Sequence, residues 1–447
     1  MQPVVSDSGG RARRPLAHNS IARLAADGSG VALGTVSSIV TARVLGPSAK
    51  GTLAALTFVT TIVIQGSLMG LGDALVVRVG QAKATVDDAL RSSLSAIIVS
   101  SGVGALVVLV YSLAQLPVHN AYVWPAVVIA CVTVAVSCAG QLLHYAVYAR
   151  HQMVTASAIT IATSAVTTTA LVVLCGVFDL DVLGGALAAL VAAVVLVSAA
   201  AFTLRRGRVA LRLGWDTEYL RPALRFGLRA QIANLLAYST ARVDLLLVYA
   251  LTTSATAGRY SVALTVGTLT GFIALSLSYA SFPGMAELPE ADALKQTADL
   301  ARVAVVVALP VAAAMAAATA FVVPFLLGTA YNGSVAPAVI LLFGNVLWGQ
   351  QWLLSRALAA RGDPNVLFWS FATNLVTMLV VDIALIPVLG AVGAAIGSVV
   401  APAAGVAVCA RAYRRRGVSL RQFVPGAADV GRVRDLALRG LGRFRPR

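Results

Sequence analysis

The chain has 447 residues, of which 59% are hydrophobic and 12% charged, and its formal net charge is +16. A soluble domain carries about 25% charged residues, so this composition excludes an ordinary soluble protein. Apolar runs of the ~20 residues that a helix needs to cross a bilayer recur along the chain, which indicates an all-α polytopic membrane protein.

Breaks between the apolar runs predict twelve transmembrane helices. The polar segment 1–20 precedes them, and no small-residue cleavage site follows the first run, so we expect an uncleaved first helix. The first half gives spans at 21–44, 52–78, 92–116, 121–149, 153–177 and 182–204. The second half gives spans at 222–251, 256–284, 298–327, 335–360, 364–388 and 391–411.

These spans divide the chain into five parts. A cytoplasmic N-terminal segment (1–20) precedes an N-lobe (21–204), and a basic connector (205–221) leads to a C-lobe (222–412) and a basic cytoplasmic tail (413–447). Asp27-Gly28-Ser29-Gly30 in the first span is either a helix break or a flexible entry to the span.

Lysine and arginine predict the orientation, because positively charged short loops stay in the cytoplasm. With the N-terminus inside, the cytoplasmic connections and their flanking helix ends contain Arg78, Lys83, Arg91, Arg150, Arg205, Arg206, Arg208, Arg212, Arg221, Arg225, Arg229, Lys295, Arg302, Arg356 and Arg361. The outer side contains Arg43, Lys50 and Arg259, the last two as expected loop charges. Both termini are therefore expected in the cytoplasm, with the chain in the plasma (inner) membrane.

Three features recur at nearly constant spacing in the two halves. Gly258 follows Gly51 by 207 positions, at a short polar corner. LLHYAVYAR at 142–150 corresponds to LLSRALAAR at 353–361, and GALAA at 185–189 corresponds to GAAIG at 393–397. This spacing predicts an internal duplication. Six helices per half place both lobes in the bilayer with the same polarity, and such parallel repeats enclose a central substrate cavity in transporters.

Several motifs follow this frame in order: ARVLGPSAKGTLAAL, GLGDALVVR, LRFGLRAQIANLLAYSTARVDLLLV, AGRYSVA, LLGTAY and IPVLGAVGAAIGS. From about residue 20 to 412 the chain resembles polysaccharide and O-antigen flippases of the multidrug/oligosaccharidyl-lipid/polysaccharide exporter superfamily. The resemblance implies a two-lobed secondary transporter working by alternating access. It would flip polyprenyl-diphosphate-linked oligosaccharide from the inner to the outer leaflet for cell-surface polysaccharide biosynthesis.

Ionisable residues inside the spans are the candidate site residues, because a charge at the bilayer centre costs from about 2.5 to more than 10 kcal/mol. Near the cytoplasmic ends these are Arg23, Asp27, Asp73, Arg78, His144, Arg229 and Arg356. If they face inward, they form a mouth for a diphosphate, whose oxygens match the donor fork of a guanidinium. The alternative is that they snorkel at the helix ends.

Arg242 and Asp244 lie deeper, in the seventh span. Two residues apart on a helix, they do not face each other, so each needs a partner on another helix. Asp244 lies in RVDLLL, where the flippases resembled here often carry an acid, and it is a candidate for a cavity or ion-coupling role or for a structural pair. Asp382 stands where the family pattern usually has Asn; it is a second ion-coupling candidate, or it bonds to a neighbour.

Other classes of site find no support in the sequence. Cys131, Cys138, Cys175 and Cys409 lie inside apolar runs without a CxxC pattern and are expected to be packing residues, and we predict no metal and no cofactor. No GxxxxGK[ST] phosphate loop is present, so no ATPase or other enzyme activity is expected.

Partners and alternatives follow from charge and loop length. The tail 413–447 is rich in arginine and should attract anionic inner-leaflet lipids, whereas no nucleic-acid-binding fold accompanies it. Polysaccharide-assembly enzymes are further candidate partners.

The alternative function is a cation-coupled multidrug exporter of the same superfamily. A membrane glycosyltransferase or polymerase would need a large outer loop or paired catalytic carboxylates, and neither is visible.

Overall fold

The computed structural model describes residues 9–117, 120–286, 289–359, 361, 363–426, 429 and 431. Within these ranges side chains are described from Gly28 onward, except at 230, 233, 272–286, 290, 291, 364 and 420. The regular structure of the described residues is helical, and the chain divides into two compact units. Unit 1 comprises Met1–Ser37 and Val59–Ile232, and unit 2 comprises Ser38–Phe58 and Ala233–Arg447.

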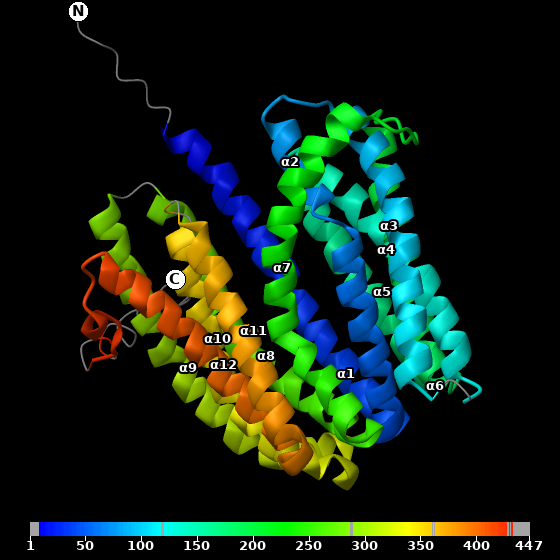
Figure 1. Cartoon of the computed structure of the whole chain (residues 1–447), viewed down its shortest axis with the longest axis vertical. Coiled ribbons are helices and arrows are strands. Elements are labelled where there is room, and N and C mark those ends of the chain that lie inside the picture. Colours follow the sequence, from blue (N-terminus) through cyan, green and yellow to red (C-terminus); the bar gives the residue numbers. More distant parts are fainter. Residues whose placement is uncertain are drawn as a thin grey trace, which may run out of the picture. The chain divides into compact units, whose positions relative to one another are not determined.

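Two long helices contribute to both units, and the others belong to one (Figure 1). The shared helices are α1 (Gly9–Ser67) and α7 (Thr217–Leu251). Unit 1 adds α2 (Leu71–Gly80), α3 (Val86–Gln115), α4 (Val123–Ala149), α5 (Met153–Gly176) and α6 (Asp181–Arg206). Unit 2 adds α8 (Ser254–Ala286), α9 (Glu290–Leu327), η1 (Thr329–Ser334), α10 (Val335–Ala359), α11 (Pro364–Leu389), α12 (Ala391–Arg415) and η2 (Leu420–Phe423).

Nine helices of the described residues are long and apolar enough to cross a membrane, and α7 makes ten if its parts Thr217–Arg229 and Asn234–Leu251 form one span. α1 is counted once although it carries two predicted spans, and Gly46 (φ 71°, ψ 174°) interrupts its helical backbone between them. The helix is continuous at 27–30, so the break considered there does not form. The expected all-α membrane fold is confirmed.

Helix ends that carry charge extend beyond the predicted spans. α3 begins at Val86, ahead of the predicted 92, because Thr85 caps it by accepting from the Asp88 amide at 3.2 Å. The Asp216 carboxylate accepts from the Glu218 amide at 2.9 Å and starts α7 in the same way. Side-chain caps satisfy amides that have no partner within the helix. Hydropathy does not register such polar turns, so it places the helix start too late.

Helix contacts inside the two units repeat with a shift of six helices. In unit 1, α4 contacts α2, α3, α5 and α6, α2 contacts α3, and α5 contacts α6. In unit 2, α10 contacts α8, α9, α11 and α12, α8 contacts α9, and α11 contacts α12. Both units also have a close approach at the start of their last long helix: a Cβ on Gly184 of α6 would lie 2.9 Å from Cys175 Sγ, and one on Gly393 of α12 would lie 2.6 Å from the Leu385 carbonyl. An internal duplication produces this pattern.

The two repeated glycine corners lie against each other within unit 2. A Cβ on Gly51 would overlap the carbonyl oxygen of Ser254, and a Cβ on Gly258 would overlap that of Pro47. The hydroxyl oxygens of Ser48 and Ser254 are 2.8 Å apart. Each copy of the corner thus needs a residue without a side chain, because only glycine lets the backbone of the other copy approach this closely.

Lys50 does not lie in a loop, although the sequence predicts it to be a loop charge. Gly46 turns the chain in one residue and α1 resumes at once, so Lys50 lies inside a helix. Its side chain is 8% exposed, and Nζ donates to Thr41 Oγ1 at 2.6 Å. Arg259 is half-buried, and its Nε donates to the carbonyl oxygen of Ala330 at 2.9 Å.

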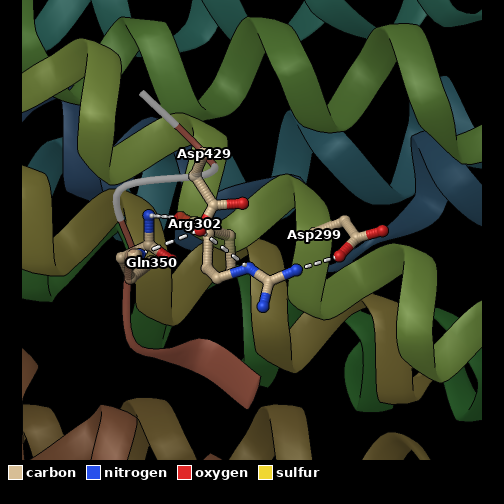
Figure 2. Close-up of polar contacts among 6 residues, drawn as sticks. Asp299, Arg302, Gln350 and Asp429 are labelled. Carbon is tan, nitrogen blue, oxygen red and sulfur yellow. Dashed lines mark hydrogen bonds and ion pairs between the residues drawn. The ribbon is translucent and has the colours of Figure 1, made fainter. Parts of the chain in front are cut away.

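The chain after α12 folds back onto unit 2. Val418 and Phe423 pack on a buried cluster contributed by α9, α10 and α12. Figure 2 shows Arg302 of α9 between Asp299 and Asp429, with 3.4 Å between Arg302 Nε and Asp429 Oδ2. The first part of the predicted tail is therefore anchored to protein, whereas its residues from 432 onward lie outside the described residues.

We expect Gly258→Ala to lower the stability of unit 2, because the added methyl group overlaps the Pro47 carbonyl. Overpacking of this kind costs about 1–3 kcal/mol. Thermal unfolding of the purified protein in detergent measures the effect. Gly34→Ala on the same helix as Gly51 is the control, since nothing lies within 4 Å of its Cβ. Equal Tm values for the two variants would contradict the close approach.

Candidate functional site

A buried polar cluster surrounds Asp244 of α7 in unit 2. Asp244 is 1% exposed, and its Oδ2 accepts from the hydroxyls of Tyr260 on α8 at 2.5 Å and Ser398 on α12 at 2.8 Å. Its Oδ1 accepts from the Leu245 amide at 2.7 Å. Arg242 makes none of these hydrogen bonds, and its side chain is exposed. The partners of Asp244 therefore come from two other helices, and the cluster joins α7, α8 and α12.

Asp382 of α11 lies beside this cluster and is fully buried. Its Oδ1 occupies the space that a Cβ on Gly397 would fill, next to Ser398 on α12. The carboxylates of Asp382 and Asp244 are close enough to act on each other electrostatically. Neither oxygen of Asp382 has a hydrogen-bond partner among the described residues, so the neighbour bond considered from the sequence does not form there.

An unpartnered buried carboxylate constrains what this site does chemically. Burying an ionised carboxylate costs several kcal/mol unless an opposite charge or hydrogen bonds compensate. Asp244 has three donors, whereas Asp382 has none among the described residues. The carboxylate of Asp244 is thus stabilised by hydrogen bonds, whereas that of Asp382 needs a proton or a cation to be stabilised.

Tyr260 and Ser398 were missed by the sequence analysis as site residues. Both lie in motifs that carry the family resemblance, AGRYSVA and GAAIGS, but neither is charged at neutral pH and nothing in one sequence links them to Asp244. The signal available from the sequence is position: Tyr260 and Ser398 each lie at a small-residue corner 16 residues after an acid, Asp244 and Asp382 respectively.

A stripe of three residues runs along one face of α10. Trp348, Trp352 and Arg356 are four positions apart and half-buried, and four positions place side chains on one helix face. The Trp348 and Trp352 ring centroids are 5.8 Å apart, and Arg356 Cζ lies 4.2 Å from the Trp352 ring centroid. Phe371 of α11 meets Trp352 edge-on at 5.0 Å. We call Trp348, Trp352 and Arg356 the α10 stripe.

A hydrogen-bonded network around the buried Gln351 of α10 holds helices of unit 2 together. Gln351 Nε2 donates to Ser370 Oγ at 3.0 Å, Asn374 Nδ2 donates to Gln351 Oε1 at 2.6 Å, and Ser370 Oγ donates to the Gly405 carbonyl at 3.0 Å. The Gln351 amide fits because Gly405 has no Cβ to displace it. These bonds tie α10, α11 and α12 together, as buried polar networks with paired members do.

Unit 1 contains six of the predicted mouth residues, and the side chains of four of them are described. The guanidinium of Arg78 lies over the Tyr219 ring at 5.2 Å, and His144 Nε2 is 3.0 Å from the Ala156 carbonyl oxygen. Asp73 is in the first turn of α2, where the helix dipole favours an acid. Arg229 of α7 is exposed.

Arg23 and Asp27 lie in the first part of α1, where the side chains are outside the described residues. Among the described residues, no group of three or more His, Cys, Asp and Glu side chains could hold a metal ion.

Solved structures show which fold this is. A lipid II flippase MurJ in an inward closed conformation matches with a TM-score of 0.67 at 11% identity, over 94% of this chain and 93% of that chain. An inward-facing multidrug resistance MATE family transporter of the MOP superfamily matches with a TM-score of 0.62 at 15% identity, over 90% and 99%. A MOP superfamily transporter from Pyrococcus furiosus gives a TM-score of 0.56 at 14% identity, over 90% and 95%.

At these identities the matches establish the shared two-lobed fold, which the sequence analysis expected. None of the curated proteins matches the sequence. A family model described as polysaccharide biosynthesis protein matches residues 40–336, which is more than half of the chain and includes Gly51, Asp244 and Gly258. The resemblance noted in the motifs is confirmed, and the chain belongs to the polysaccharide biosynthesis protein family.

Proposed function

We propose that this protein flips a polyprenyl-diphosphate-linked oligosaccharide from the inner to the outer leaflet for cell-surface polysaccharide biosynthesis. The observation that carries the proposal is the α10 stripe, Trp348, Trp352 and Arg356. Aromatic faces suit the apolar faces of sugar rings, and a guanidinium suits phosphate oxygens. One helix face thus offers both chemistries that the head group requires.

The rest of the binding path is proposed from charge. Arg23, Asp27, Asp73, Arg78, His144, Arg229, Arg242 and Asp244 are the further candidates from the sequence. Tyr219 stacks with Arg78 and Trp352 stacks with Arg356, so both arginines are held at an aromatic ring in a fixed position. Fixed cations bind a diphosphate at a lower entropic cost than mobile ones do. We also propose that both termini lie in the cytoplasm, as the loop charges predict.

Two energy sources fit the residues. A diphosphate head group with about two negative charges that moves outward across about 100 mV, inside negative, releases about 2 × 2.3 kcal/mol. We also propose that Asp382, assisted by Asp244, takes up a proton or monovalent cation and couples this uptake to export. The carboxylate of Asp382 is buried and accepts no hydrogen bond from the described residues, which supports this role.

A cation-coupled multidrug exporter is the second candidate function. The buried acids Asp244 and Asp382 favour it, since a deep acid suits both cation coupling and a cationic drug. The arginine of the α10 stripe opposes it, because a guanidinium repels cationic substrates.

Transport itself tests the proposal. In proteoliposomes that contain the purified protein and a polyprenyl-diphosphate oligosaccharide, the sugar should become accessible to an external glycosidase faster than in protein-free vesicles. Deletion of the gene should leave this lipid accumulated on the inner leaflet. Ethidium export with no movement of the oligosaccharide would instead favour the multidrug exporter.

Arg356→Ala should lower the flipping rate at least about tenfold, as expected for the loss of a charged hydrogen bond worth about 1.5 kcal/mol or more. Arg229→Ala should also impair flipping, with normal membrane expression in both cases. Arg411→Ala is the matched control, because Arg411 is an exposed arginine of α12 in the same unit. Full activity in both test variants would contradict the proposal that arginines line the substrate path.

Asp382→Asn should abolish the dependence of transport on an ion gradient while leaving transport driven by membrane potential. The variant should keep or raise the Tm, because it removes a buried charge that has no hydrogen-bond partner among the described residues. The measurement compares flux in proteoliposomes with imposed pH, Na⁺ or potential gradients. Asp292→Asn, at an exposed acid near the start of α9, is the control. Unchanged ion dependence in Asp382→Asn would sink the coupling role.

Cross-linking of the glycine corners should stop transport reversibly. Residues 38–58 come from the first repeat but pack in unit 2, so we expect an outward opening to break the Ser48–Ser254 contact. Ser48→Cys with Ser254→Cys should be inactive after oxidation and active again after reduction. The control pair is Ser37→Cys with Thr168→Cys, whose hydroxyls are 2.9 Å apart within unit 1. Transport that persists in the oxidised test pair, with the disulfide verified by mass spectrometry, would contradict this expectation.

A further inference from the structure

An open groove of about 620 Å³ lies in unit 1, where α5 begins and α6 ends. Its walls are the turn and first residues of α5 on one side and the last turn of α6 on the other: His151, Gln152, Met153, Val154, Thr155, Phe202, Thr203, Arg206 and Gly207. In the orientation proposed above, with both termini in the cytoplasm, this end lies at the cytoplasmic membrane surface. None of these residues belongs to the binding path proposed above.

The groove is cationic, and its charge is not neutralised by the described residues. Arg206 is exposed, with its Cζ 4.8 Å from the Phe202 ring centroid. Arg150 lies behind Gly207, where a Cβ would be 2.8 Å from its Nη2. Arg150 Nε is buried and makes no hydrogen bond to a described residue, and none of the ion pairs found among these residues involves Arg150 or Arg206. The side chains described around the groove thus supply no negative charge to balance these two arginines.

The backbone around the groove adds to the positive potential. α5 starts at Met153, and Gln152 before it makes no side-chain capping bond, so the first amides of a 24-residue helix border the groove. The carbonyls that end α6 are satisfied, because the amides of Gly207 and Val209 donate to Thr203 and Leu204 at 3.1 and 3.0 Å. A helix N-terminus attracts an anion, and carbonyl oxygens that already accept hydrogen bonds repel an anion less than free carbonyl oxygens do.

The groove also has an apolar side. Phe202 is 59% exposed, and Val154 and Met153 are exposed at its opposite wall. Large apolar side chains beside arginine at a helix end match the boundary between head groups and acyl chains. A soluble anion would use the cations and leave these side chains in water, whereas a lipid uses both.

We propose that this groove binds the phosphate of an anionic glycerophospholipid in the inner leaflet. The phosphate lies between Arg206 and the first amides of α5, with Arg150 behind it, and the acyl chains run along Phe202 and Val154. Thr155 and His151 supply further donors to the phosphate oxygens. This lipid fixes the cytoplasmic end of unit 1 to the leaflet from which the proposed substrate comes, but the groove does not depend on that substrate.

His151 provides a variant that separates binding from folding. Its φ of 59° lies in the left-handed region, which favours glycine, so His151→Gly removes a donor from the groove while relieving backbone strain. Ala82, with a φ of 54° at the end of α2, offers the matched change Ala82→Gly outside the groove. Both variants should keep or raise the Tm, and His151→Gly alone should lower lipid retention.

The experiment measures lipid retained by the full-length protein. The protein is extracted from vesicles of phosphatidylcholine with one-fifth phosphatidylglycerol, and retained lipids are counted by native mass spectrometry. Arg206→Gln should lower phosphatidylglycerol retention about fivefold, which corresponds to the ~1 kcal/mol of one basic residue near an anionic surface. Arg205→Gln is the control, because Arg205 is equally exposed on α6 and does not line the groove.

Three results would overturn the proposal. The first is equal retention of phosphatidylglycerol and phosphatidylcholine by the wild type. The second is an equal loss of phosphatidylglycerol in Arg205→Gln and Arg206→Gln, which would indicate a diffuse surface charge. The third is displacement of the lipid by millimolar inorganic phosphate or glycerol 3-phosphate, which would assign the groove to a soluble phosphate. Flipping activity is not used as a readout, so failure of the proposed transport function leaves this test intact.

Discussion

Backbone and side-chain polar groups in the hydrocarbon must find their partners inside the protein, and the rest of this structure depends on that constraint. It makes the described regular structure helical and favours hydrogen bonds from buried polar side chains to neighbouring helices. Asp244 recruits Tyr260 and Ser398, and Gln351 recruits Ser370 and Asn374. Because such bonds are expensive to lose, they set which helices of unit 2 belong together. The carboxylate oxygens of Asp382 have no such bond among the described residues, and this is why we propose Asp382 for ion coupling.

The fold also depends on glycine at positions where helices approach each other closely. Where two backbones must come close, as at Gly51 and Gly258, or where a side chain must fit beside a helix, as at Gly397 and Gly405, a Cβ would overlap its neighbour. Small residues at helix contacts allow the packing that replaces a hydrophobic driving force in lipid. The polar clusters exist because these glycines leave room for them. Packing and function therefore depend on the same small set of positions.

The two proposed ligand surfaces use related chemistry at different places. The α10 stripe combines tryptophan and arginine on a half-buried helix face of unit 2, whereas the groove of unit 1 combines phenylalanine, arginine and helix amides in the open. A guanidinium stacked on an aromatic ring stays charged and keeps its donors directed outward. The first surface suits a head group in transit, and the second suits a lipid that stays.

The sequence by itself determined the all-α membrane class, most helix ends to within about two turns, the duplication and the family, because hydropathy, breakers and recurring spacing are local properties of the chain. It singled out Asp244 and Asp382 because charge inside an apolar run is conspicuous. Only the tertiary structure decided that Asp382 lies beside Asp244, that Tyr260 and Ser398 complete the cluster, that Lys50 is buried, and that α5 and α6 enclose a cationic groove. These are contacts between helices distant in the sequence, and interhelical distance is not encoded in the periodicity of any one helix.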